Sequence, residues 1–144
     1  MTVFSLPDPA RALLESDAVA TVITVDQDGG PQVTLAWVGL EGDDIVFATM
    51  PDQRKLRNIR RDPRVAISVP SDVTNDWGLR EYLVVYGTAS VSEGGAAEML
   101  QQLARTYLGP DVVFPGMPDP PPGFVTRVTP ERIGGVGPWN PPRG

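Results

Sequence analysis

The chain has 144 residues, of which 41% are hydrophobic, and a formal net charge of −6 at pH 7. This length fits one domain, residues 1–144, with a core of its own, and the acidic balance disfavours nucleic-acid binding. Cysteine and histidine are both absent, which excludes disulfides, cysteine nucleophiles, serine–histidine triads and the commonest zinc sites. An enzyme of this composition would most simply take its chemistry from an organic cofactor.

No part of the sequence suggests a membrane or export segment. No window approaches the ~18 to 20 consecutive apolar residues of a membrane span. The N-terminal residues lack a charged region followed by an apolar run. We therefore expect a cytoplasmic protein without a membrane span.

Along the chain, runs of β-branched residues alternate with turn sequences rich in Gly, Asp and Pro, which predicts strands joined by tight turns. Helices are indicated by apolar residues at helical spacing and by Asp or Pro near their starts. Six antiparallel strands with appended helices predict a mainly β, α+β fold of the barrel class. The expected strands are 18–25, 32–40, 45–49, 64–69, 81–91 and 124–128, and the expected helices are 8–16, 53–61 and 95–108.

Several connecting features bear on a binding site. Residues 70–79 are expected to form a polar loop that carries Trp77, and Gly87 is expected to mark a bulge or a point of close approach. Residues 109–123 contain six prolines and predict a long irregular loop, either functional or loosely ordered. The last helix is expected to bury one face, made of Ala97, Leu100, Leu103, Ala104 and Tyr107.

The segment 53–64 is a basic island, because it holds six of the twelve basic residues, including the only lysine, Lys55. With Asp52 as the N-cap of the second helix, Leu56 and Ile59 form its buried stripe. Lys55 falls on the flank of that stripe, beside the free N–H groups of the first turn, an arrangement that suits a phosphate. The alternative is a solvated face whose arginines pair with carboxylates.

The run Lys-Leu-Arg-Asn-Ile-Arg-Arg-Asp-Pro-Arg at 55–64 follows Thr49 and Met50 at the end of the third expected strand. With Asp-Gly-Gly-Pro-Gln at 28–32 and Thr-Pro-Glu-Arg-Ile at 129–133, this order resembles the pyridoxamine-phosphate-oxidase-like split-barrel family. More narrowly, it resembles the F420-dependent (deazaflavin) reductases of type B. The resemblance covers nearly the whole chain and implies a split β-barrel of the FMN-binding type.

The same resemblance implies a homodimer with two equivalent cofactor sites in its interface groove. It also implies F420 as the cofactor and hydride transfer between F420 and a small conjugated substrate. F420 carries a glutamate tail that FMN lacks, so basic residues beyond the phosphate would have carboxylates to meet. The implied cofactor-binding residues are Lys55 and Arg54 at the phosphate with Asn58 in support, Gln32, Thr34, Ala48, Thr49 and Met50 along the ring system, Arg60 and Arg61 at the tail, and Trp77 from the partner subunit.

Three other functions stay open at this point. The same fold could use FMN in an oxidase-like flavoprotein, could bind or carry F420 without turnover, or could be a structural dimer whose basic face binds nothing. The sequence identifies no catalytic residue and no metal site. A proton for the substrate would come from water, the cofactor, Tyr82 or Tyr86, and we expect no protein general acid. Trp37 is expected in the barrel core or interface. Trp139 is expected to pack the tail, with sealing of the groove as the alternative.

Overall fold

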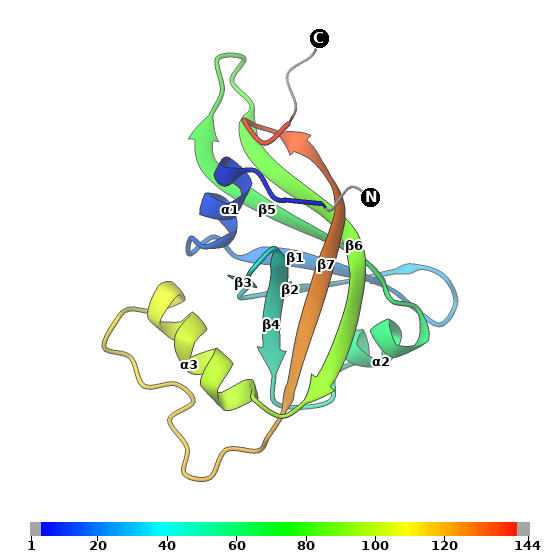
Figure 1. The fold of residues 1–144 in the computed structure, drawn as a ribbon, viewed down its shortest axis with the longest axis vertical. Coiled ribbons are helices and arrows are strands. Elements are labelled where there is room, and N and C mark those ends of the chain that lie inside the picture. Colours follow the sequence, from blue (N-terminus) through cyan, green and yellow to red (C-terminus); the bar gives the residue numbers. More distant parts are fainter. Residues whose placement is uncertain (1–3, 141–144) are drawn as a thin grey trace.

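The computed structural model describes residues 4–140, in which one seven-stranded antiparallel sheet is accompanied by three helices (Figure 1). Residues 1–3 and 141–144 lie outside the described part. The strands are β1 (Ala20–Val25), β2 (Pro31–Ala36), β3 (Gly39–Glu41), β4 (Asp44–Thr49), β5 (Arg64–Thr74), β6 (Arg80–Glu93) and β7 (Phe124–Val136), and the helices are α1 (Asp8–Leu14), α2 (Arg54–Arg61) and α3 (Ala96–Tyr107).

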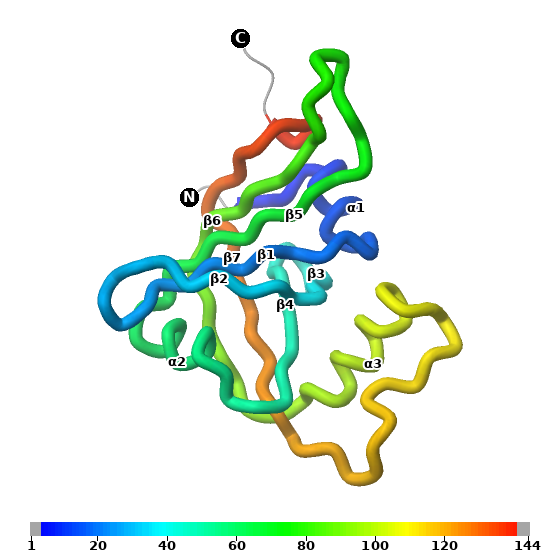
Figure 2. The backbone as a smooth tube through the Cα atoms, turned by 180° about the vertical axis from the view of Figure 1, so that it is seen from behind, coloured from blue at the N-terminus to red at the C-terminus, as the bar shows by residue number. Residues whose placement is uncertain are grey.

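The connection between β2 and β3 explains why the sheet is curled. The strand order is β2-β1-β5-β6-β7-β4-β3, so β2 and β3 form the two opposite edges. Only Trp37 and Val38 separate these two strands along the chain, so the sheet curls until its edges come close without pairing (Figure 2). The predicted mainly β split barrel is confirmed, and its opening lies between β2 and β3.

The expected single strand at 32–40 is wrong, because the structure divides it into β2 and β3. The break is made by tertiary contacts. The Tyr107 hydroxyl accepts a hydrogen bond from the Val38 N–H at 3.0 Å, and it donates to Ala18 O at 2.9 Å. These bonds satisfy the backbone where the chain passes from one sheet edge to the other. Ala36, Trp37 and Val38 are all apolar and include no turn residue, so the sequence gives no sign of the break.

The expected loop at 70–79 is also wrong, because β5 continues to Thr74 and only residues 75–79 turn into β6. Pro70 is tolerated inside β5 because β1 pairs only with residues 66–68, so the missing N–H of the proline faces no β1 partner. The resulting hairpin projects from the barrel (Figure 1). It carries Trp77 near its tip, 89% exposed.

Gly87 lies at a close approach, as expected. A Cβ atom there would lie 2.3 Å from the carbonyl oxygen of Thr129, and the pairing of β6 with β7 changes register between Tyr86 and Gly87. The last strand is longer than predicted, because β7 continues past this bulge to Val136 instead of ending at Val128. This long β6–β7 pairing lies in the interior of the sheet, away from its edges β2 and β3.

Helix α3 covers β4 with a face that overlaps the expected one only in part. Leu103 and Ala104 are buried as expected, and Met99 packs with Leu103 against Val46, whereas Ala97 and Leu100 are only half-buried. Helix α1 buries Ala10 and Leu14 against the barrel. The central core consists of fully buried apolar side chains, including Val22, Ile45, Phe47, Ile67, Leu83, Val85 and Val128.

Candidate functional site

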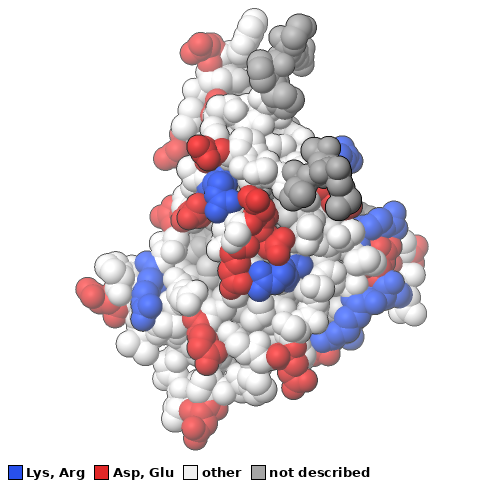
Figure 3. All heavy atoms as spheres, viewed as in Figure 1, with Lys and Arg blue, Asp and Glu red and all other residues white. Residues whose placement is uncertain are grey.

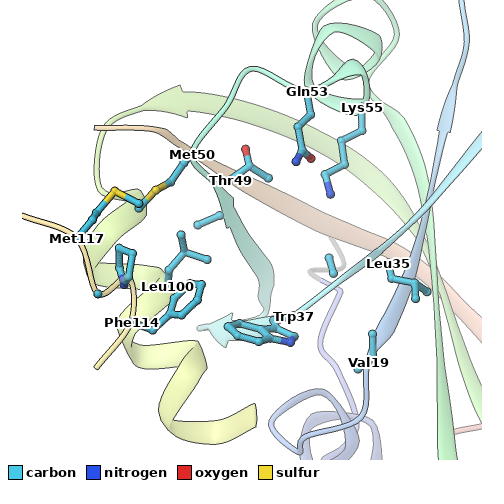
Figure 4. A pocket seen from close by; sticks show the side chains of 14 residues that line it. Val19, Leu35, Trp37, Thr49, Met50, Gln53, Lys55, Leu100, Phe114 and Met117 are labelled. Carbon is cyan, nitrogen blue, oxygen red and sulfur yellow. The ribbon is translucent and has the colours of Figure 1, made fainter. Parts of the chain in front are cut away.

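A cavity of about 550 Å³ lies beside the opening of the barrel, within the size range of small-molecule sites. The end of β2, the end of β4, the start of α2, α3 and the proline-rich loop all contribute to it (Figure 4). Its walls are mainly apolar, with polar groups gathered at the α2 end. The lining residues are Val19, Leu35, Ala36, Trp37, Ala48, Thr49, Met50, Gln53, Lys55, Leu100, Phe114, Pro115, Gly116 and Met117.

Helix α2 places Lys55 at the polar end of this cavity. Leu56 and Ile59 anchor the helix, with 0% and 2% of their surface exposed, as predicted. Lys55 is itself only 4% exposed, and its ammonium points into the cavity (Figure 4). The nitrogen lies 5.2 Å from the centre of the Phe47 ring. A buried cation thus forms part of the cavity wall.

The start of α2 differs from the prediction. The N-cap is Gln53 rather than Asp52, and no side chain of residues 4–140 caps the helix. Asp52 instead accepts a hydrogen bond from the Arg60 guanidinium at 2.9 Å. The backbone N–H groups of Arg54 and Lys55 have no hydrogen-bond partner among residues 4–140. The first turn therefore offers donors beside the cavity.

The polar groups at this end lack partners of their own. Within residues 4–140, Lys55 makes no hydrogen bond and no ion pair, and burial lowers the pKa of its ammonium. The Thr49 hydroxyl is buried without a hydrogen-bond partner in the same part of the chain. Burying such groups unpaired costs free energy. An anionic ligand with several oxygen acceptors, such as a phosphate, matches this set of donors.

The arginines of α2 are arranged differently from Lys55. Arg54 forms a two-point ion pair with Asp26, in which Nε lies 2.8 Å from Oδ1, and Arg60 pairs with Asp52. Neither arginine lines the cavity. On the face drawn in Figure 3, basic side chains lie next to acidic ones rather than in a patch of one sign. The guanidinium groups of these two arginines are thus already paired with carboxylates at the protein surface.

Asn58 ties α2 to the end of β1. Its amide nitrogen donates to Thr24 Oγ1 and Asp26 Oδ1, each at 3.0 Å, and its oxygen accepts from Arg61 at 2.9 Å. Arg61 also donates to the carbonyl oxygen of Val25 at 2.7 Å. Asn58 is 2% exposed, so the network is buried at its centre. It holds the helix, and with it Lys55, in position.

The two polar residues of β2 share one half-buried face, as their spacing predicted, while Val33 on the other face is 59% exposed. Gln32 accepts a hydrogen bond from the Thr24 hydroxyl at 2.7 Å. The Thr34 hydroxyl is buried and has no partner among the described residues. Neither residue lines the cavity, although Ala36, the next on that face, does.

Of the residues implied by the resemblance, the structure therefore brings four together at the cavity: Ala48, Thr49, Met50 and Lys55. Arg54, Asn58, Arg60 and Arg61 lie around the helix behind it, and Gln32 and Thr34 lie beside it. Trp77 lies far outside it, near the tip of the β5–β6 hairpin.

Sequence reasoning missed the wall opposite Lys55. Trp37, expected in the core or interface, lines the cavity and stacks on Tyr107 with ring centres 5.4 Å apart. Phe114 and Met117, in the proline-rich loop, complete this wall. The available signal was the presence of two large apolar side chains, Phe114 and Met117, in a loop rich in proline and glycine, because large apolar side chains tend to be covered by other parts of a protein.

Among residues 4–140, no group of three or more Asp or Glu side chains is arranged to hold a metal ion. The longest helix in that range, α3, has 12 residues, and no helix there has the length and apolar content needed to cross a membrane.

Solved structures with the same fold include one named as a reductase, one named as a storage protein and one whose name states no function. An F420 reductase shares 28% identity at a TM-score of 0.73, with 90% of this chain and 98% of that chain covered. A conserved hypothetical protein from Mycobacterium tuberculosis shares 20% identity at 0.71, covering 91% and 84%. HutZ, the heme storage protein from Vibrio cholerae, shares 20% identity at 0.65, covering 92% and 95%. The last two likenesses show the fold alone.

The family model for pyridoxamine 5'-phosphate oxidase matches residues 6–137 of this chain. That range takes in all seven strands up to Val136 and all three helices. The sheet order, the split between β2 and β3 and the cavity beside it are therefore features of the matched region as a whole. The chain belongs to the pyridoxamine 5'-phosphate oxidase family.

Proposed function

We propose that this protein is an oxidoreductase that binds F420 in the cavity beside α2 and transfers a hydride between the deazaflavin and a small conjugated substrate. The observation that carries the proposal is Lys55, a buried ammonium in a cavity wall with no carboxylate partner among residues 4–140. An unpaired buried cation is costly unless a ligand supplies the opposite charge. Membership of the family and likeness to an F420 reductase support the choice of cofactor.

In this proposal each group at the cavity has one task. Lys55 binds the cofactor phosphate, and the Thr49 hydroxyl donates a hydrogen bond to it. Ala48 and Met50 contact the ring system and, with Trp37, exclude water from it. F420 supplies the hydride chemistry when it is bound. The protein therefore acts by binding, orienting and shielding.

The positions of the tyrosines bear on which group protonates the substrate. Tyr82 and Tyr86 are 40% and 37% exposed, and neither lines the cavity. Tyr107 is committed to backbone groups through its hydroxyl, and burial raises its pKa. We therefore propose that water, rather than a side chain, protonates the substrate.

FMN is the second candidate cofactor, because a single phosphate would satisfy Lys55 equally well. Likeness to an F420 reductase favours F420 over FMN. Arg60 is paired with Asp52 but keeps 43% of its side chain exposed, and in this proposal it meets a tail carboxylate of F420. Heme binding finds less support, because the sequence has neither histidine nor cysteine to coordinate the iron.

Parallel titrations of the protein with oxidised F420 and with FMN test the cofactor. Saturable micromolar binding of F420, followed by quenching of its fluorescence, supports the proposal. Preference for FMN would identify an FMN-dependent flavoprotein, and binding of neither would contradict the site.

A second assay separates an enzyme from a carrier. Reduced F420 is incubated with the protein and a panel of cyclic enones, quinones and tetrapyrroles, and its reoxidation is followed by absorbance. Oxidation that depends on both protein and acceptor is expected. Tight binding of F420 without oxidation by any acceptor would instead indicate a non-catalytic F420-binding protein.

A further inference from the structure

The proline-rich loop contributes Phe114, Pro115, Gly116 and Met117 to the cavity. We propose that Gln101 is a positioning residue that fixes segment 112–117 as the specificity wall of this cavity. We also propose that the wall accepts a flat, apolar and uncharged part of the ligand. This inference deepens the proposed function and rests on it for the identity of the cofactor.

Gln101 lies on α3 and uses both ends of its side-chain amide on the loop. Its Nε2 donates to the carbonyl oxygen of Val112 at 2.8 Å, and its Oε1 accepts from the N–H of Phe114 at 3.0 Å. One half-buried side chain thus satisfies two backbone groups of a segment that itself lies outside the helices and strands. The hydrogen bonds fix the Phe114 backbone relative to the helix.

The Phe114 ring is held from the other side by an aromatic stack. It lies 5.4 Å from the Trp37 ring at an angle of 59°, a tilted contact typical of aromatic pairs. Trp37 in turn stacks on Tyr107, whose hydroxyl bonds the backbone at Ala18 and Val38. The loop wall is therefore continuous with the barrel opening.

The end of the loop is also attached to the start of α3. Gly94 N–H donates to Gly123 O at 2.8 Å, and Ala96 N–H donates to Pro122 O at 3.1 Å. The loop is therefore held at both ends: Gln101 fixes segment 112–117 at Val112 and Phe114, and the start of α3 fixes the loop at residues 122–123. A segment held in this way presents one defined surface to the cavity.

The chemistry of the wall defines what it accepts. Met50 and Met117 lie close together on one side of the cavity, near Leu100 and Phe114 (Figure 4). Thioethers and aromatic rings suit flat, polarisable groups. Lys55 is the one charged side chain among the described residues that line the cavity, and it lies at the other end. A second anionic group placed at the wall would be buried without a partner.

The two hydrogen bonds from Gln101 to Val112 and Phe114, called the clamp below, are tested with Gln101→Met. This substitution keeps the length and helix propensity of the side chain but removes both hydrogen bonds. Gln102→Met is the matched control, because Gln102 is the exposed neighbour on α3 and makes no hydrogen bond to the loop within residues 4–140. Hydrogen exchange is measured on the peptide that spans 112–117. Gln101→Met is expected to accelerate exchange there about five- to tenfold, the equivalent of about one lost hydrogen bond, while Gln102→Met leaves it unchanged.

The wall's selectivity is tested without cofactor, using the fluorescence of toluidinylnaphthalene sulfonate and its displacement by naphthalene monosulfonate or disulfonate. Wild-type protein is expected to bind the monosulfonate at least about tenfold more tightly than the disulfonate, because the second charge meets no cation at the wall. Gln101→Met and Phe114→Ala should each weaken monosulfonate binding about fivefold or more and narrow this ratio.

Two results would overturn the inference: equal behaviour of Gln101→Met and Gln102→Met in exchange, or equal binding of the two sulfonates by the wild-type protein. Both readouts are independent of F420. If F420 fails to bind while the clamp and the sulfonate preference are found, the proposed cofactor is wrong and the wall stands. If F420 binds and the clamp is absent, only the inference about Gln101 fails.

Discussion

The two faces of α2 carry the same kind of charge and differ in what that charge meets. On the outer face, Arg54 and Arg60 lie within 2.9 Å of carboxylate oxygens of Asp26 and Asp52. On the inner face, Lys55 is buried at a cavity and has no such partner among residues 4–140. A count of basic residues therefore does not locate the binding site; burial without a partner does.

The largest effect on stability is expected from Asn58→Ala, which removes the buried link between α2 and β1. The substitution deletes three hydrogen bonds and leaves the Arg61 guanidinium and the Thr24 hydroxyl short of partners. The free energy of unfolding should fall by about 2 to 4 kcal/mol, measured by urea denaturation. Asn140→Ala, at an exposed amide with one hydrogen bond to Gly135 O, should cost about 1 kcal/mol or less. Equal losses for both variants would show that the network does not hold α2.

A pH-dependent effect should distinguish Lys55 from the arginines. Burial lowers its pKa from the ordinary value of 10.5, so between the lowered pKa and 10.5 the unfolded chain binds more protons than the folded one. The free energy of unfolding of the ligand-free protein should therefore rise with pH across this window. Affinity for a phosphate ligand should fall there, because the ammonium loses its charge.

The measurement is urea denaturation at a series of alkaline pH values for the wild type and Lys55→Met. Other titrating groups are common to both proteins, so the difference between them isolates Lys55. A difference that does not change with pH would contradict a lowered pKa.

A smaller effect is expected at the outer face if it meets the cofactor tail. Arg60→Met should weaken binding of F420 about two- to threefold, the magnitude of an exposed ion pair, and should leave binding of F420 without its glutamate tail unchanged. Arg57→Met is the control, since Arg57 donates to the backbone oxygen of Asp52. A similar loss with and without the tail would assign Arg60 to holding the helix instead.

The smallest effect on folding is expected from Trp77→Ala. With 89% of its surface exposed, the side chain gains little from folding, and the free energy of unfolding should change by about 0.5 kcal/mol or less. In the predicted homodimer, Trp77 reaches the partner's cofactor, so F420 affinity should fall in the same variant. Unchanged affinity would place Trp77 outside the site.

The sequence was sufficient for much of this architecture because the relevant signals are local. Runs of β-branched residues identified the strands, and the spacing of Leu56 and Ile59 identified the buried side of α2. The flank position of Lys55 followed from the same geometry. These features depend on residues within a few turns of each other.

The remaining features depend on contacts between distant segments. The break at Trp37 and Val38 arises because the chain passes there from one edge of the sheet to the other and Tyr107 bonds the backbone. The carboxylate that pairs with Arg54 comes from Asp26, 28 positions earlier in the chain. The contact of Phe114 with Trp37 likewise requires the fold. Local patterns carry no information on such partners, so they could not separate the outer face of α2 from the inner one.

The most direct measurement is a titration of F420 against the wild type, Lys55→Met and Arg54→Met under identical conditions. We predict that Lys55→Met weakens binding by about ten- to a hundredfold, the contribution of a charged hydrogen bond, whereas Arg54→Met weakens it by about threefold or less. Unchanged affinity in Lys55→Met, or a larger loss in Arg54→Met, would contradict the assignment of the buried lysine as the cofactor's anion site.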